Sequence, residues 1–127
     1  MSDATTRDIR IEVQSFYDEE RSSPAESYYF FAYRVRISNL GTVTAQLVSR
    51  EWFITDANGE TQRVQGPGVV GEQPVLAPGD SFEYTSFCPL TTPVGAMRGT
   101  YRMVLESGES FEAEIAPFGL AVPHAVN

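Results

Sequence analysis

The residues from 28 to 39 read YYFFAYRVRISN and have the period of two that is typical of a β-strand. Tyr29, Phe31, Tyr33, Val35 and Ile37 fall on one face, and Tyr28, Phe30, Ala32, Arg34 and Arg36 fall on the other. The first half of this strand is apolar on both faces, so we expect each face to be covered by something. Asn39-Leu40-Gly41 then turns the chain with residues that tolerate a positive φ.

Other parts of the chain show the same alternation, and no stretch holds a helical period. About seven short antiparallel strands are expected in all, separated by turn signals such as Asp56-Ala57-Asn58-Gly59. This pattern predicts an all-β fold, an immunoglobulin-like or fibronectin type III-like sandwich. The further strands are expected at residues 8–16, 44–56, 60–65, 80–87, 95–106 and 110–116, with a short bridge at Val75-Leu76.

Two aromatic residues favour the immunoglobulin-like form of the sandwich. Trp52 lies midway along its strand, where such domains commonly bury a tryptophan. Tyr101 resembles the tyrosine-corner residue, and Met103 stands two positions later, where antibody domains place a cysteine. Val48, Trp52 and Ile54 are the expected core residues of the third strand.

Length and charge limit the classes of function. The 127 residues fit one domain, in which we expect residues 1–7 to be disordered and 123–127 to be frayed. The net charge is −8, and all nine basic residues are arginines, so broad contact with nucleic acid or an anionic membrane is disfavoured. The single cysteine, Cys88, reads as a buried small hydrophobe and suits a reducing compartment, which makes the cytoplasm the expected location.

Residues 66–71 spell the G-x-G-x-x-G pattern of dinucleotide-binding loops through Gly66, Gly68 and Gly71. That motif requires a helix that begins within it, and Glu72-Gln73-Pro74 follows instead, so a Rossmann site is not expected. Two interpretations remain open. The glycines could serve tight bends alone, or the loop could bind a nucleotide or pyrophosphate weakly, as a backbone nest beside Arg63.

The sequence offers no residue set for catalysis or for a metal. His124 is the single histidine and lies near the end of the chain, and Cys88 stands alone. The acidic run Asp18-Glu19-Glu20 reads as a solvated loop. No enzyme activity, catalytic residue, metal or cofactor is therefore predicted.

The outer face of the strand at residues 28–39 is the candidate contact surface. Tyr28, Phe30, Arg34 and Arg36 share this face, and aromatic and arginine side chains are enriched at protein interfaces. The alternative is that the tail, with Phe118 and Leu120, folds across the face and covers it.

Several segments resemble the bacterial ApaG family over nearly the whole chain. They are residues 50–56, 64–74, 76–79, 82–86, 95–101 and 115–118. The resemblance implies a fibronectin type III or immunoglobulin-like sandwich and an association with cobalt resistance and magnesium efflux. Similar domains in eukaryotic F-box proteins and in a DNA-polymerase-interacting protein are thought to make protein–protein contacts. The family has no accepted catalytic residues.

Together these observations predict a non-catalytic module that binds another protein or a second copy of itself. The alternative is a small-anion binding protein that uses Arg63, Gly66, Gly68 and Gly71.

Overall fold

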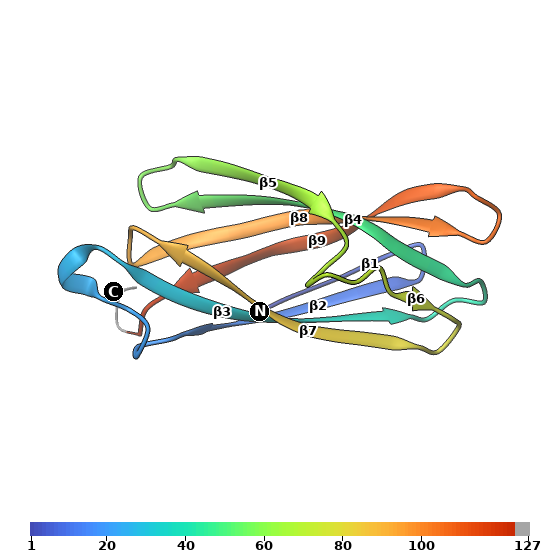
Figure 1. Ribbon diagram of the computed structural model, residues 1–127, viewed down its shortest axis with the longest axis horizontal. Helices are drawn as coiled ribbons and strands as arrows, with labels where there is room; N and C mark the ends of the chain where they lie inside the picture. The colour runs from blue at the N-terminus through green and yellow to red at the C-terminus, as the bar shows by residue number, and fades with distance from the viewer. Residues whose placement is uncertain (124–127) are drawn as a thin grey trace.

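The computed structural model describes residues 1–123, which form nine strands and one turn of 3-10 helix, η1, at Pro24–Glu26 (Figure 1). The strand count is therefore nine, whereas the sequence predicted about seven. No helix in this part of the chain is long and apolar enough to span a membrane. The strands are β1 (Ser2–Thr6), β2 (Ile9–Tyr17), β3 (Tyr29–Asn39), β4 (Ala45–Asp56), β5 (Thr61–Pro67), β6 (Val75–Leu76), β7 (Ser81–Leu90), β8 (Val94–Leu105) and β9 (Ser110–Ala121).

Two antiparallel sheets pack face to face, which confirms the predicted all-β sandwich. One sheet has the order β1-β2-β3-β7, and the other has the order β5-β4-β8-β9, with β6 paired to β4 (Figure 1). Along one side the sheets are joined, because the Glu114 amide donates to Thr6 Oγ1 over 3.1 Å and Ser15 Oγ donates to the Gly119 carbonyl over 2.7 Å. The outer edges of β5 and β7 carry Pro67 and Pro89, which have no N–H to offer a further strand.

The expectation that residues 1–7 are disordered is wrong, because β1 pairs with β2 from Ser2↔Val13 to Thr6↔Ile9. A two-residue turn joins the strands, and its residues Arg7 and Asp8 have φ of 45° and 67°. Positive φ at both central residues matches the twist of a hairpin. The segment Ser-Asp-Ala-Thr-Thr has no apolar alternation, so its sequence gave no signal of a strand.

The C-terminal segment is also more ordered than expected. β9 was predicted to stop at Ala116, and it continues to Ala121 beside β8. A bulge at Ala116-Pro117 shifts the alternation, so that Phe118 and Leu120 continue the buried face begun by Ala113 and Ile115. Fraying was expected at residues 123–127. Of these the structure describes Pro123 alone, and residues 124–127, which include His124, lie outside the described part of the chain.

A second bulge, at Val48 in β4, corrects one predicted core position. The register of β4 with β8 shifts between Leu47 and Ser49, which reverses the inward face along the strand. Leu47 is therefore fully buried, whereas Val48 is only half-buried. Trp52 faces inward and is buried as expected.

The core is centred on Trp52, whose ring makes edge-on contacts with aromatic rings from both sheets. The centroid distances are 5.4 Å to Tyr33, 6.2 Å to Tyr101 and 5.9 Å to Phe118. Tyr101 differs from a tyrosine corner, because its buried hydroxyl is hydrogen-bonded to the hydroxyl of Tyr84 rather than to the backbone. Met103, which stands two positions after Tyr101, is buried as well.

Gly99 of β8 is paired in register with Trp52 of β4. A Cβ at this position would overlap the carbonyl oxygen of Glu51 and lie 3.2 Å from the Cα of Trp52. Gly119 in β9 has no heavy atom within 4 Å of the equivalent point.

We therefore expect Gly99→Ala to destabilise the protein by about 3 kcal/mol or to prevent folding, because backbone cannot move aside as a side chain can. Gly119→Ala is the matched control and should change the free energy of unfolding by less than about 1 kcal/mol. Urea denaturation followed by tryptophan fluorescence measures both. Equal stability of the two variants would contradict the close approach of β4 and β8.

Candidate functional site

The outer face of the four-stranded sheet carries a cluster of aromatic side chains, here called the aromatic face: exposed Phe16, Tyr28 and Phe87, and half-buried Phe30. Register places Phe16 of β2, Ala32 of β3 and Phe87 of β7 in one row across the sheet. The ring of Phe30 lies 5.4 Å from that of Phe87 and 6.2 Å from that of Tyr28. Phe16, Tyr28 and Phe87 are 40%, 39% and 48% exposed. These rings form one apolar patch beside solvent.

Arginine side chains surround this patch. The guanidinium of Arg21 lies 5.6 Å and 5.2 Å from the ring centres of Phe30 and Phe87, and that of Arg34 lies 5.5 Å from the ring centre of Phe16. Such cation–π contacts favour this arrangement of the rings and guanidinium groups. Arg36 continues the row of Arg34 along β3, between Glu12 of β2 and Glu83 of β7.

Of the four residues predicted for this surface, Phe30, Arg34 and Arg36 lie on the outer side of β3, and the Tyr28 ring packs 6.2 Å from that of Phe30. The structure also rejects the alternative cover, because Phe118 and Leu120 are buried in the core between the two sheets. The sequence pattern did not single out Phe16, Phe87 or Arg21 for this surface. The alternation of β7 puts Phe87 on the other face of the strand from Phe82 and Tyr84, so the sequence already indicated that Phe87 points outward.

The glycine-rich segment at residues 66–74 forms a tight hairpin at its centre and no helix. Val69 and Glu72 exchange two backbone hydrogen bonds of 2.8 Å and 2.9 Å, with Val70 and Gly71 at the tip. Gly68 has φ of 59°, and its amide donates to the Val48 carbonyl over 2.9 Å. The amides of Gly68, Val69 and Glu72 are therefore occupied within the protein.

Arg63 does not reach these glycines. It pairs in register with Phe53, and its Nε donates to Glu51 Oε2 over 2.7 Å. Arg50, rather than Arg63, contacts the glycine-rich segment. Its Nη1 donates to the carbonyl oxygens of Pro67 and Gly68, both over 2.9 Å, and a Cβ on Gly66 would lie 2.9 Å from its Nη2. Gly66 thus leaves room for the guanidinium to lie against the backbone of β5.

A cavity of about 200 Å³ opens beside Arg50 between the two sheets. Its walls carry the side chains of Tyr33, Tyr84 and Ser86, with residues 69–71 at the rim. Burial raises the pKa of the Tyr33 and Tyr84 hydroxyls, and the charge of Arg50 acts in the opposite direction. These hydroxyls are therefore neutral at pH 7 and can donate hydrogen bonds.

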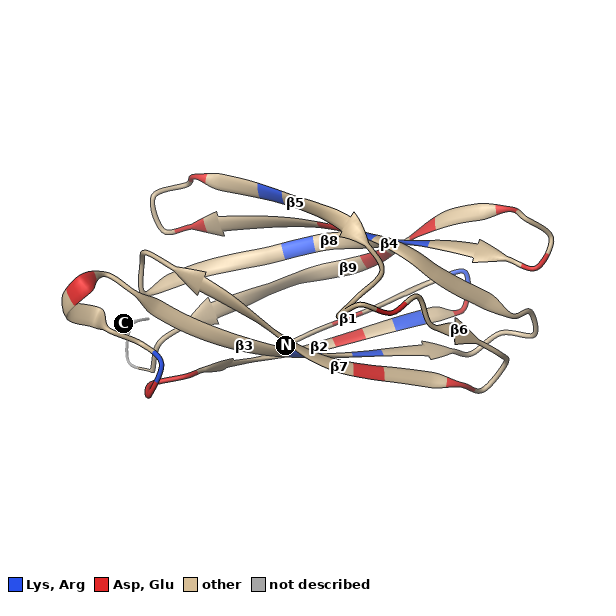
Figure 2. Cartoon of the chain, viewed as in Figure 1, with Lys and Arg blue, Asp and Glu red and all other residues tan. Residues whose placement is uncertain are grey.

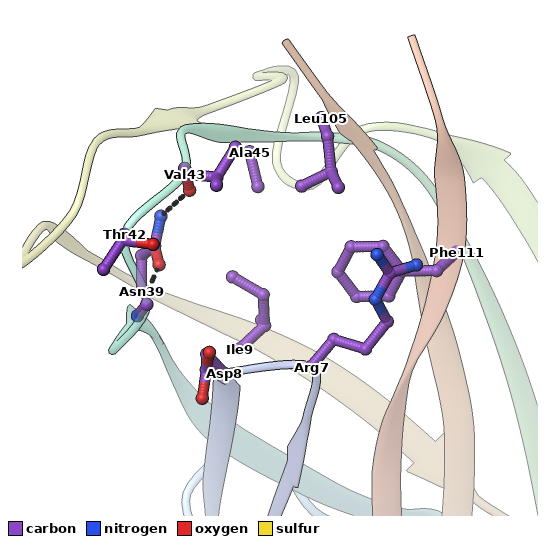
Figure 3. Close-up of a pocket in the computed structure, with 10 residues that line it drawn as sticks. Arg7, Asp8, Ile9, Asn39, Thr42, Val43, Ala45, Leu105 and Phe111 are labelled. Carbon is purple, nitrogen blue, oxygen red and sulfur yellow. Dashed lines mark hydrogen bonds between the residues drawn. The ribbon is translucent and has the colours of Figure 1, made fainter. Parts of the chain in front are cut away.

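A second cavity, of about 270 Å³, lies at the end of the sandwich near the turns that follow β1 and β3 (Figure 3). Its apolar wall includes Ile9, Leu105 and Phe111, and Arg7 lies over the Phe111 ring while pairing with Glu109 over 3.0 Å. The side-chain amide of Asn39 is fully used, since it donates to the carbonyls of Val43 and Leu76 and accepts from the Gly41 amide. This cavity is a gap at the end of the core with most of its polar groups already bonded.

Acidic residues gather in the turns at both ends of the sandwich (Figure 2). In the part of the chain that the structure describes, no group of three or more His, Cys, Asp or Glu side chains is placed to hold a metal ion. The association with cobalt and magnesium thus gains no structural counterpart among residues 1–123.

Comparisons with known proteins agree on one family. The model of the ApaG domain matches residues 19–105. A protein named ApaG from Anaeromyxobacter sp. (strain K) is 58% identical over all 127 residues and over its own full length, and one from Beijerinckia indica subsp. indica is 56% identical over 97% of this chain and 95% of its own. A crystal structure described as an ApaA protein from Bordetella pertussis superposes with a TM-score of 0.90 at 52% identity, covering 95% of this chain and 98% of that one.

Val70 has a φ of 43°, a backbone conformation that is costly for a β-branched residue. Its side chain is 53% exposed, so little burial is lost if it is replaced. We expect Val70→Asn to raise the free energy of unfolding by about 1 kcal/mol, because asparagine suits this position of a tight hairpin turn. Val43→Asn, at another exposed valine, is the control in urea denaturation. Equal effects of the two changes would show that Val70 is not strained.

Cys88 is buried on the inner side of β7, and burial raises the pKa of its thiol from 9.0 to about 11. Thiolate is the reactive form, so we expect iodoacetamide to modify the native protein at pH 8 at least about a hundredfold more slowly than the urea-unfolded chain. The native rate should rise with pH up to about 11. Because the unfolded chain loses this proton first, the thiol also makes folding less favourable as pH rises above 9. A native rate that levels off near pH 9 would contradict this environment.

Proposed function

The chain belongs to the ApaG family, and on that premise we propose that it is a protein-interaction module without catalytic activity, which binds its partner through the aromatic face. The observation that carries the proposal is the row of exposed rings at Phe16 and Phe87 across the outer side of the sheet. We place the protein in the cytoplasm, where its free thiol would stay reduced.

The physical reason is that these rings gain most when another protein covers them. A buried aromatic side chain contributes a large apolar area at a low cost in conformational entropy, and aromatic and arginine residues dominate the binding energy of many interfaces. The rings are already ordered by their contacts with Arg21 and Arg34, which reduces the entropy lost on binding.

Charge indicates the chemistry of the partner. Arg34 stands between Gln14 and Thr85 in register, and among residues 1–123 no carboxylate forms an ion pair with it within 4.0 Å, whereas Arg36 is flanked by Glu12 and Glu83. We infer that the partner presents a segment in which acidic side chains flank apolar ones. A second copy of this chain fits less well, because a two-fold axis through the arginine pair would bring like charges together.

Weak binding of a nucleotide or pyrophosphate at Gly66, Gly68 and Gly71 with Arg63 is the weaker candidate. The charge of Arg63 is compensated by Glu51, and the amides of Gly68, Val69 and Glu72 are occupied. We therefore do not propose a nucleotide site that depends on Arg63.

We expect Phe87→Ser and Arg34→Glu each to weaken capture of the partner from a cytosolic extract of the source cells by about tenfold or more. Val75→Ser is the matched control, since Val75 is 59% exposed but lies on β6 in the other sheet. Quantitative mass spectrometry of immobilised wild type and variants identifies the proteins that respond to the face variants and not to the control.

Two outcomes would count against the proposal. Proteins captured equally by wild type, Phe87→Ser and Arg34→Glu would show that the aromatic face is not the contact surface. A concentration-dependent dimer in solution that Phe87→Ser abolishes would identify a second copy as the occupant in place of an acidic partner.

A further inference from the structure

Arg50 is a charged residue that faces the interior of the sandwich. It follows the Val48 bulge, shares the inward face of β4 with Trp52, and lies directly opposite buried Tyr101 of β8. The residue is half-buried, so its guanidinium lies at the border between the core and solvent, where a dissolved anion can reach it.

The compensation visible in residues 1–123 is incomplete. No carboxylate there lies within 4.0 Å of Arg50 in an ion pair. Its two hydrogen bonds, to the carbonyls of Pro67 and Gly68, both come from Nη1. A guanidinium has five N–H donors, so Nε and Nη2 keep donors with no acceptor among the described residues; neither atom is buried, and both are open to water or to an anion.

The cavity beside Arg50 supplies further donors. The neutral hydroxyls of Tyr33, Tyr84 and Ser86 line it. The amides of Val70 and Gly71 lie at its rim and make no hydrogen bond within the described chain. The Tyr84 hydroxyl already shares a hydrogen bond with Tyr101 and can donate to a further group when Tyr101 is the donor of that bond. The Ser86 hydroxyl and the two amides can donate directly, and no acidic side chain is among the lining residues.

The rim also stores backbone strain at Val70. Strained backbone residues are common at ligand-binding and other functional sites, where the surrounding structure maintains the strain. The strain is an observation independent of the Arg50 charge, and both occur at the same cavity.

We propose that this cavity binds a single oxyanion group, a phosphate or a carboxylate, between the Arg50 guanidinium and the hydroxyls of Tyr84 and Ser86. The planar fork of arginine matches the oxygen spacing of both groups. A volume of about 200 Å³ is below the usual range for complete small-molecule ligands, so one oxyanion enters and the rest of its carrier stays outside. The site is separate from the aromatic face and does not depend on it.

The test is a titration of the full chain with sodium phosphate and, separately, sodium acetate, followed by two-dimensional ¹H–¹⁵N NMR. Sodium chloride keeps the ionic strength constant and reports unspecific charge effects. We expect saturable shifts confined to the amides of Val70, Gly71 and Ser86, and a rise in Tm with the same ligand. Saturation by phosphate alone identifies a phosphate group as the ligand, and saturation by acetate identifies a carboxylate.

Variants locate the site. Arg50→Gln should weaken binding about tenfold or more, because a charge-assisted pair is lost, whereas Arg102→Gln removes an equal charge from the outer side of β8 and should have no effect. Should Arg50→Gln fail to fold, Ser86→Ala removes one donor from the cavity and should weaken binding while leaving the Arg50 contacts intact.

The proposal is overturned if neither phosphate nor acetate gives a saturable shift in the wild-type protein, or if chloride reproduces the shifts. Loss of binding in Arg63→Gln with retention in Arg50→Gln would also overturn it, and would move the site to the outer side of β5.

Discussion

Trp52 and the three aromatic rings around it join the two sheets through the core and set the distance between them. Tyr33 comes from one sheet, while Tyr101 and Phe118 come from the sheet that carries Trp52, so the cluster bridges the layers. Gly99 permits this arrangement because β4 and β8 pair there with no room for a side chain. Both the aromatic face and the Arg50 cavity depend on this spacing, since one lies outside the sheet that the cluster supports and the other lies between the sheets.

Alternation of apolar residues was sufficient to predict the sandwich and most of β3, β7 and β8. It failed where a bulge in the backbone shifts the alternation of inward and outward residues. The bulges at Val48 and at Ala116-Pro117 each reverse the inward side of a strand, and a period-two pattern cannot show this because the extra residue is defined by its pairing. β1 was missed for a different reason: Ser2–Thr6 is a polar strand, held by its backbone pairing with β2.

The candidate surfaces were predictable in part. The alternation of β3 placed Tyr28, Phe30, Arg34 and Arg36 on one side, but Phe16 and Phe87 join them only through the order of the strands in the sheet, which local sequence does not encode. The sequence indicated Arg63 as the arginine beside the glycine-rich loop because it lies near that loop along the chain. Arg50 lies opposite Gly66 across the β4–β5 pair, and that pairing, rather than sequence distance, decides which arginine touches the loop.

The two prolines at the sheet edges have a consequence for how the molecule behaves at high concentration. Pro67 and Pro89 interrupt the outward row of backbone donors on β5 and β7, and the opposite edges, β1 and β9, lie against each other. Strand-to-strand addition between molecules, the route to fibrils, is therefore opposed at the edges of β5 and β7 and on the side where β1 and β9 meet. A domain built in this way can expose several aromatic rings on one sheet face while offering few open strand edges for other molecules to extend.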